Sequence, residues 1–443
     1  MANDKDFVVN GPIAVGKDTK VTVGTIASGA VDLSTGNYFT DSPSGDYTYT
    51  FANAGDVQSF QIEATGGSAA VAQTFSTTLY DGTGAAQDIT NGLDLAGDGG
   101  LVWVKHRDQA FEHMLADTET GAGYYLSSNS TQRALGPNST ALTSFNSNGF
   151  SIGSLNDYNY SVAPKRFVSW SFKKQTKFFD VVTWTGDGNA GRTISHSLGS
   201  APATIIIKRV SFSQFTTNNW FYHTNFGASS YDLLYLNLTS AASSQNYSTG
   251  AIQSAPTNST FTLKNSDDVN GSGATYVAYL FAHDTASDGL IQCGSYTGNG
   301  AADGPEVNLG WSPQWILVKN ADTAYGWIIL DTARGIAASP PTANVLFANN
   351  SNSEDPAGNR MHFTSTGFKI TTSSFDYNKS GDNFIYMAIR SPSAPAITWP
   401  SSIEWTGGST PSTPAEGETD VYTFTTDDGG TTYTGIQSID NAS

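Results

Sequence analysis

The chain has 443 residues, a formal net charge of −18 and only 14% charged residues, whereas ordinary soluble domains carry ~25%. The acidic balance argues against nucleic acid and anionic membranes as partners, because phosphate groups need Lys and Arg opposite them. Cys293 is the single cysteine, which excludes an intrachain disulfide and the two-cysteine zinc motifs.

The residue types favour strands over helices. Gly, Ser, Thr and Asn are abundant, as in chains of many short strands joined by tight turns. No stretch keeps helical apolar spacing over three turns, and none approaches membrane-spanning length. We therefore predict an all-β chain without membrane insertion. The opening MANDKDF lacks the pattern of a signal peptide, so we expect synthesis in a cytoplasm.

Residues 1–66 are predicted to form small strands and turns, and a short linker rich in Ala, Ser and Gly follows them. After this linker, three landmarks recur along the chain. The landmarks are a Gly turn (YDGTG, WTGDG, YTGNG), an apolar strand ending in Lys (GGLVWVK, APATIIIK, PQWILVK) and a final strand (FVSWSF, YVAYLF, FIYMAI). They keep one order and one spacing of roughly 105 residues, which indicates three diverged copies of one module.

The repeats place the modules at residues 75–174, 178–284 and 290–390, and residues 396–443 form the last strands. The short joints between modules would leave neighbours in contact. The Lys strand is apolar throughout, so both of its faces should be covered. In the final strand Val168, Trp170 and Phe172 share one face, which we predict to point into the core. Each module is expected to have about seven short strands in an antiparallel sandwich; the sheet order stays open.

One segment holds acidic residues and histidines together: His106, Asp108, Glu112, His113 and Asp117. The third copy aligns there without a gap and has Asn320 opposite His106 and Trp327 opposite His113. A histidine that exchanges with an indole fills space, so neither metal binding nor catalysis is expected. Asp117 and its counterpart Asp331 are predicted to be turn formers whose side chains bond to nearby amides.

Calcium is a more plausible bound ion than a metal at residues 106–117. Asp94 and Asp98 lie in a Gly-rich loop, and loop oxygens suit Ca²⁺, but the spacing of known calcium loops is absent and Asp beside Gly is ordinary turn chemistry. No GxSxG, HExxH or phosphate-binding loop is present, and no pair of acids is singled out. We expect no catalytic residue, no cofactor and no enzyme activity.

Aromatic residues in loops are the best candidates for ligand binding, because sugars and proteins dock on exposed rings. Phe212 and Phe215 lie in a loop that is longer in the second copy, and Tyr158 and Tyr377 occupy matching loops of the first and third copies. The alternative is that these rings pack on a neighbouring module or subunit.

The modules resemble an uncharacterised domain common in marine tailed bacteriophages, cyanophages among them, on the residues GLVWVK, SFNSNGFSIGS, VSWSFKK, TYVAYLFAHD and STGFKI. The ends resemble a module of tail-fibre-like virion proteins on VDLSTGNYFT, DVQSFQIEATGG, AITWPSSIEWTGG and DVYTFTTDDGGTTYTG. The end phrases usually run on as one domain. The resemblance therefore implies that the three modules are inserted in a loop of a small β-domain built from residues 1–66 plus 396–443.

The resemblance implies a virion structural protein, and we expect a tail-fibre-like surface subunit for host attachment. It also implies a homotrimer whose other partners are tail or capsid proteins. The alternatives are a capsid decoration or head-fibre protein, a glycan-binding adhesin that contacts host surface sugar, and a polysaccharide depolymerase.

Overall fold

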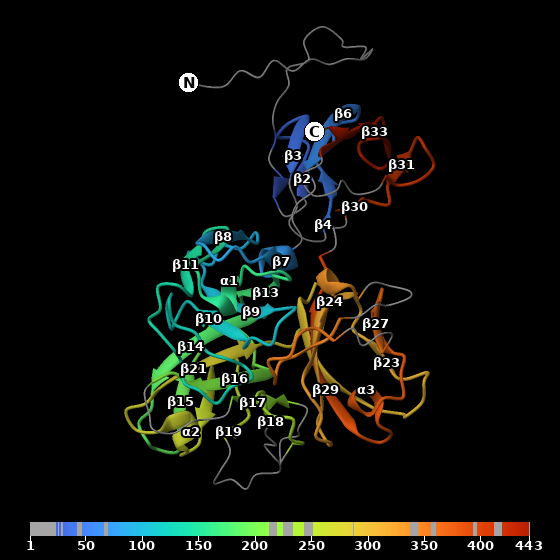
Figure 1. Cartoon of the computed structure of the whole chain (residues 1–443). Helices are drawn as coiled ribbons and strands as arrows, with labels where there is room; N and C mark the ends of the chain where they lie inside the picture. The colour runs from blue at the N-terminus through green and yellow to red at the C-terminus, as the bar shows by residue number, and fades with distance from the viewer. Residues whose placement is uncertain are drawn as a thin grey trace. The chain divides into compact units, whose positions relative to one another are not determined.

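The computed structural model describes residues 24, 26–27, 30–41, 47–65, 70–211, 219–224, 234–242, 251–286, 288–336, 344–355, 360–392, 397–411 and 419–442 (Figure 1). The chain divides into two compact units, unit 1 (Met1–Ala69 with Ser393–Ser443) and unit 2 (Ala70–Pro392). Almost every regular element is a strand, and the three α-helices are one turn long. The all-β prediction is confirmed.

Unit 1 is built from both ends of the chain. Its larger sheet has the order β3 (Tyr38–Asp41), β6 (Gln58–Thr65), β32 (Thr419–Thr426), β33 (Tyr433–Ala442) and β31 (Ile403–Trp405). The smaller ones are β1 (Ile26–Ala27), β2 (Ala30–Asp32) and β5 (Thr50–Ala52), and the pair β4 (Tyr47–Thr48) with β30 (Ile397–Thr398). In the central pair β6 runs antiparallel to β32, with Thr65 opposite Thr419. The core of unit 1 therefore joins residues far apart in the sequence.

Module 1 of unit 2 is a sandwich of two antiparallel sheets. Its main sheet has the order β10 (Met114–Asp117), β9 (Gly100–His106), β13 (Arg166–Lys173) and β7 (Phe75–Asp81). Its small sheet has the order β11 (Leu142–Asn146), β12 (Gly149–Ile152) and β8 (Gln87–Thr90), and helix α1 (Asn156–Asn159) precedes β13.

Modules 2 and 3 repeat this plan with one more strand in the main sheet. In module 2 the sheets are β14 (Phe179–Thr185), β21 (Thr275–Phe281), β16 (Thr204–Arg209), β17 (Trp220–His223) and β18 (Leu234–Tyr235), over β15 (Arg192–Ser195), β20 (Thr260–Leu263) and β19 (Ile252–Ser254). In module 3 they are β22 (Ile291–Thr297), β29 (Asn383–Arg390), β24 (Pro313–Asn320), β25 (Ile328–Asp331) and β26 (Leu346–Phe347), over β23 (Glu306–Asn308), β28 (Gly367–Ile370) and β27 (Met361–Thr364). Helices α2 (Asp267–Asn270) and α3 (Phe375–Asn378) correspond to α1.

The two faces of each main sheet are covered by different parts of unit 2. Val102 and Val104 of β9 pack with Ile89 and Phe150 of the small sheet in the core of module 1. The intervening residues point the opposite way, because successive side chains of a strand alternate. Trp103 is nevertheless only 1% exposed. The outer face of the main sheet is therefore covered by something other than its own sandwich.

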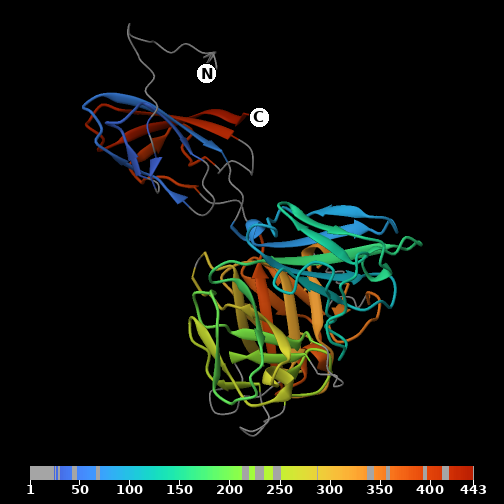
Figure 2. The same cartoon turned by 90° about the vertical axis from the view of Figure 1, so that its left-hand side faces the viewer.

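The other two modules provide that cover, which contradicts the predicted orientation of the final strand of module 1. Val168, Trp170 and Phe172 do not point into the core of module 1; they lie on the outer face of its main sheet. The ring of Phe172 lies 5.5 Å from that of Phe281 in module 2 and 5.9 Å from that of Trp315 in module 3. Figure 2 shows the three modules packed directly against one another. Unit 2 thus has a shared interior as well as sandwich cores.

The peptide links between modules, and those to unit 1, all start at the same end of each module. In module 1 the residues Phe75, Leu101 and Phe172 lie in register at this end, which we call the joint end. Phe179 with Phe281 and Ile291 with Ile389 mark it in modules 2 and 3. The opposite loop ends carry the Gly turn, the loop after the Lys strand and the short helix. Loop ends are thereby free of module-to-module connections.

The shared interior predicts a large effect of one ring. Phe172→Ala should lower the free energy of unfolding by about 3–5 kcal/mol, because a buried ring that touches all three modules leaves a cavity. Urea unfolding measures this, with Leu79→Ala as the control, since Leu79 is 41% exposed on the same sheet. A loss no larger for Phe172 than for Leu79 would contradict the shared interior.

Candidate functional site

Equivalent residues join the three modules in a cycle. The strand beside the Lys strand ends at Asp117, His223 and Asp331 in modules 1, 2 and 3. Each of these side chains meets the last strand of another module, in the contacts Asp117 Oδ2 with the Tyr279 hydroxyl (2.9 Å), His223 Nε2 with the Tyr386 carbonyl oxygen (3.3 Å) and Asp331 Oδ2 with the Trp170 indole N–H (2.9 Å). The order is 1 with 2, 2 with 3 and 3 with 1, so the contacts close a ring.

A second set of equivalent residues runs around the same ring. The residue immediately before the same strand is His113, Asn219 or Trp327, and each is bonded to a backbone carbonyl of another module. The contacts are His113 Nε2 to Phe347 (3.0 Å), Asn219 Nδ2 to Ser127 (3.1 Å) and Ser128 (2.6 Å), and Trp327 Nε1 to Tyr235 (3.0 Å). Two independent positions therefore show the same pseudo-threefold arrangement.

Both ring nitrogens of the buried His113 have hydrogen-bond partners. The indole N–H of Trp103 donates to His113 Nδ1 at 2.9 Å, so Nε2 carries the proton and donates to Phe347. Burial holds the pKa of His113 well below its usual value, which keeps the ring neutral. This ring is a bridge between modules 1 and 3.

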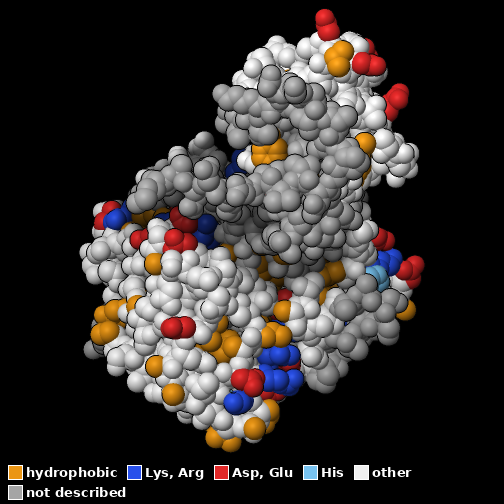
Figure 3. Space-filling view, turned by 90° about the horizontal axis from the view of Figure 1, so that it is seen from above, with side chains coloured by type: hydrophobic (Ala, Val, Ile, Leu, Met, Phe, Trp, Pro, Cys, Tyr) orange, Lys and Arg blue, Asp and Glu red, His pale blue; other side chains and the backbone are white. Residues whose placement is uncertain are grey.

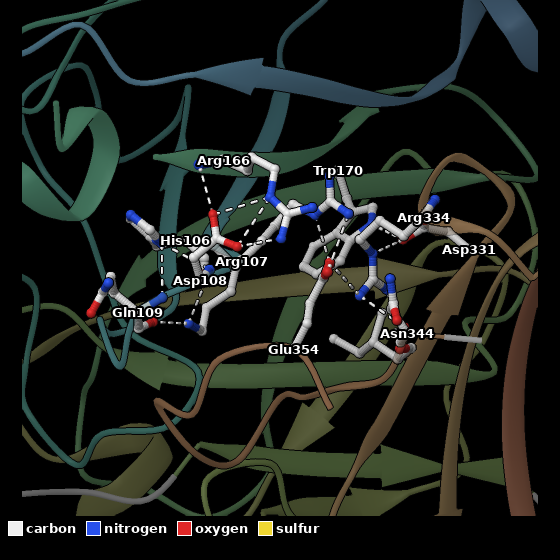
Figure 4. A network of polar contacts seen from close by, with 12 residues as sticks. His106, Arg107, Asp108, Gln109, Arg166, Trp170, Asp331, Arg334, Asn344 and Glu354 are labelled. Carbon is white, nitrogen blue, oxygen red and sulfur yellow. Dashed lines mark hydrogen bonds and ion pairs between the residues drawn. The ribbon is translucent and has the colours of Figure 1, made fainter. Parts of the chain in front are cut away.

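The junction of modules 1 and 3 also contains a charged network (Figure 4). Arg107 donates from Nε to Glu354 Oε1 at 2.6 Å and from its terminal nitrogen to Oε2 at 3.1 Å, a bidentate pair. Arg334 lies 3.5 Å from the same Glu354 and 2.6 Å from Asp331, and its guanidinium is 5.3 Å from the Trp170 ring. These side chains are nearly inaccessible to solvent, and two positive and two negative groups balance each other.

Three buried lysines form a further repeated feature. Lys105, Lys208 and Lys319 are at most 2% exposed. Lys105 Nζ donates to the carbonyls of His106 (2.6 Å) and Gln109 (3.2 Å), Lys319 Nζ to those of Asn320 and Thr323, and Lys208 Nζ to Ser130 of module 1 (3.0 Å). Burial lowers the pKa to about 8 for Lys105 and about 7 for Lys208 and Lys319. In modules 1 and 3 the amine fastens the loop that follows the strand.

Three buried asparagines hold the loop ends in the same way. Asn159, Asn270 and Asn378 close the short helices and are 0% exposed. Asn378 Oδ1 accepts from the amide of Asn299 at 2.8 Å and Nδ2 donates to the carbonyl of Ala301 at 2.7 Å, so it ties α3 to the Gly turn. These asparagines are not among the site residues predicted from the sequence. The recurrence of Asp, then Tyr or Val, then Asn at one spacing was the available signal.

Two of the four predicted loop aromatics do not form a surface site. Tyr158 and Tyr377 are 0% and 1% exposed, so the expectation of exposed rings is wrong for both. They point inward because the short helices turn this residue into the sandwich core, where Tyr158 packs beside Phe150. Phe212 and Phe215 lie outside the described residues.

Asp94 and Asp98 are engaged with protein groups. Asp94 Oδ1 accepts from the amide of Gly97 at 2.7 Å, and Asp98 Oδ2 lies 2.9 Å from the ammonium of Lys173. Within the described ranges there is no group of three or more His, Cys, Asp or Glu side chains that could hold a metal ion. The described contacts give no support to a calcium site at these two residues.

The remaining candidates act within turns. His106 Nδ1 accepts from the amides of Asp108 and Gln109 at 3.0 and 3.1 Å, as Asn320 Oδ1 does for Asp322 and Thr323. Asp117 Oδ1 accepts from the amide of Thr120, and Asp331 Oδ1 from that of Arg334. The prediction that Asp117 and Asp331 form turns is confirmed, but their second oxygens, which reach another module, were not foreseen.

Two buried tyrosines form a matched pair for mutation. The Tyr279 hydroxyl bonds to Asp117, whereas the Tyr158 hydroxyl has no hydrogen-bond partner among the described residues. Tyr279→Phe should lower the free energy of unfolding by about 1–3 kcal/mol, because the buried carboxylate of Asp117 loses a hydrogen-bond donor. Tyr158→Phe should leave the free energy of unfolding unchanged or raise it. Urea unfolding distinguishes these outcomes, and equal losses would contradict the junction.

The buried amine of Lys319 predicts a pH dependence. The pKa of Lys319 in the folded state is about 7, below the usual Lys value of 10.5. Between these two pH values the unfolded state binds more protons than the folded state, so the free energy of unfolding rises with pH across this range. The cost of charging the amine is fully present below the folded pKa. Lys319→Met removes this cost, so its stability relative to wild type should improve by about 2–3 kcal/mol from about pH 9 to about pH 6.

Denaturation of both proteins at several pH values measures the change, with Lys177→Met as the control, since the Lys177 side chain is 65% exposed. A difference between Lys319→Met and wild type that does not vary with pH would refute the prediction.

None of the helices in the described part of the chain is both long and apolar enough to cross a membrane. A comparison with curated proteins found no similar sequence. Residues 70–392 match the family model described as Domain of unknown function (DUF7483). The matched range coincides with unit 2, the three-module ring. Because it covers well over half of the sequence, the chain belongs to the DUF7483 family.

Proposed function

We propose that this protein is a structural subunit of a bacteriophage virion surface. In this proposal unit 1 attaches the subunit to the particle, and the three-module ring of unit 2 is displayed for host attachment. The tail-fibre-like location implied by the sequence resemblance is preferred, and a capsid decoration or head fibre is the alternative. No reaction is assigned to the protein.

One observation carries the proposal. Every peptide link between modules, and both peptides that lead to unit 1, start at the joint ends of the modules, where residues such as Phe75, Phe172 and Ile389 lie. No peptide link between modules starts at the loop ends, whose loops are held by hydrogen bonds from Lys105, Lys319 and the buried asparagines. A rigid block with its attachments at one side and supported loops at the other suits display.

The use of polar groups supports a structural rather than a catalytic role. Several described buried charges of unit 2, Asp331 and Lys105 among them, join modules or fasten loops. On the face drawn in Figure 3 the hydrophobic side chains of the described residues form several small, separate groups. Such a surface suits an exposed subunit.

Particle imaging tests this proposal. An epitope inserted after Ala302, in the exposed Gly turn of module 3, should be labelled by antibody on intact virions. The same epitope after Ser443 should be labelled closer to the particle surface, because unit 1 is the proposed anchor. Virions that carry the protein with neither site labelled, or with the order reversed, would contradict the anchoring.

The homotrimer implied by the resemblance stays a prediction. Its contacts would belong to unit 1, because unit 2 already closes a pseudo-threefold ring within one chain. Light scattering on the purified chain should then give three times the monomer mass of 46.8 kDa. A monomer would remove the trimer and leave the display role intact.

A glycan-binding adhesin is the second candidate. At the loop end of module 1 the half-buried rings of Phe111 and Tyr160 lie 5.2 Å apart, and Val162 nearby in the chain is 59% exposed. Aromatic rings at a surface can stack on sugars. Binding on a glycan array that is lost in Phe111→Ala but kept in Leu135→Ala would favour this role, since Leu135 is 37% exposed in another segment of module 1.

A further inference from the structure

The three junctions of the ring differ in one covalent respect. Residues 174–178 join modules 1 and 2, and residues 282–290 join modules 2 and 3. Modules 1 and 3 have no direct peptide connection. Their junction must be held by side chains and backbone hydrogen bonds alone.

The same backbone bond occurs at two of the junctions, with different side chains. The amide of Glu354 donates to the carbonyl of Arg107 at 2.7 Å where modules 3 and 1 meet, and the amide of Ala242 donates to the carbonyl of Ala321 at 2.6 Å where modules 2 and 3 meet. Arg107 and Ala321 each lie two residues after the Lys strand's lysine. The covalently tethered junction therefore has alanines where the untethered one has an ion pair.

The Arg107–Glu354 pair is also the one salt bridge between modules, among the described residues, in which both side chains are buried, at 9% and 7% exposure. Arg334 adds a second contact to Glu354, and Trp170 covers Arg334. A buried bidentate pair requires close geometry, because any separation leaves charges without partners. It favours one arrangement of modules 1 and 3.

Closing this junction brings the first and last strands of unit 2 together. The ring of Phe75, at the start of the first strand, lies 6.2 Å from that of Trp315, and Trp315 pairs with Ile389 near the end of the last strand. The two peptides that lead into unit 1 therefore begin beside each other. If modules 1 and 3 separated, the peptides would be held together only through the length of three modules.

Unit 1 needs those peptides close together. Its central pair joins β6 to β32, with Gln58 opposite Thr426 and Thr65 opposite Thr419, and the whole of unit 2 lies between the partners in the sequence. The cost of closing a loop rises with the length of the loop. A closed ring replaces this long loop by two connectors, residues 66–74 and residues 391–418.

We propose that the Arg107–Glu354–Arg334 cluster is a latch that couples closure of the three-module ring to the assembly of unit 1 from the two chain ends. If the chain from residue 66 to 418 were fully flexible, closing the ring would leave only residues 66–74 and 391–418 as loop, about nine-fold fewer. The three-halves-power law then gives about 30-fold as the upper limit for the rise in the β6–β32 pairing constant. The latch thus acts on a unit that it does not touch.

Hydrogen exchange on the intact chain tests the latch, read by mass spectrometry. Glu354→Gln should speed exchange in residues 344–355 and, through the coupling, raise the exchange rates of β6 and β32 several-fold, with about 30-fold as the limit. The amides of β21, inside module 2, should not change. Arg107→Met serves as the second variant if Glu354→Gln does not fold, because Glu354 then keeps Arg334.

His223→Asn is the matched control, since it weakens the junction of modules 2 and 3 and leaves modules 1 and 3 closed. It should leave β6 and β32 unchanged. Three outcomes would overturn the proposal: faster exchange in residues 344–355 without an effect on β6 and β32, no change in residues 344–355 at all, or an equal effect of His223→Asn.

Discussion

The main sheet of every module is apolar on both faces, and the rest of unit 2 follows from covering the second face. In β24 all residues from Pro313 to Asn320 are buried. The small sheet covers one face, and the other would expose large rings to water if the module stood alone. Three such faces placed around an axis cover one another, which is why Phe172 touches rings from both other modules. The short joints keep neighbours together, and the third contact comes from closing the ring.

Polar groups define how the three faces meet. Apolar surfaces slide over one another at little cost, whereas a buried donor needs a partner at one position. Asp117, His223 and Asp331 supply such partners at equivalent places, and each takes a different group from the next module. The ring therefore has a defined register although its three modules have diverged. The charged cluster of Arg107, Glu354 and Arg334 occurs at the one junction where no peptide links the modules.

Sequence patterns predicted the parts better than their packing. Period and spacing identified the repeats and the strands, and the all-β class is confirmed. The same alternation placed Val168, Trp170 and Phe172 on one face but could not say which body covers that face. Tyr158 and Tyr377 looked like loop residues because a one-turn helix has no apolar period long enough to read. Arg334 and Glu354 have no charged equivalents in the other copies, so no recurrence marked them. The buried lysines did recur, but a strand that ends in Lys normally ends at the surface.

The direct contact of modules 1 and 3 is the central claim, and a double-mutant cycle on Arg107→Met and Glu354→Gln measures it most directly. Chemical unfolding of the wild type, the two single variants and the double variant gives their coupling energy. The closed ring predicts at least about 1.5 kcal/mol, as for close charge pairs in other proteins. A coupling of zero would mean that these side chains do not meet and that the ring is open.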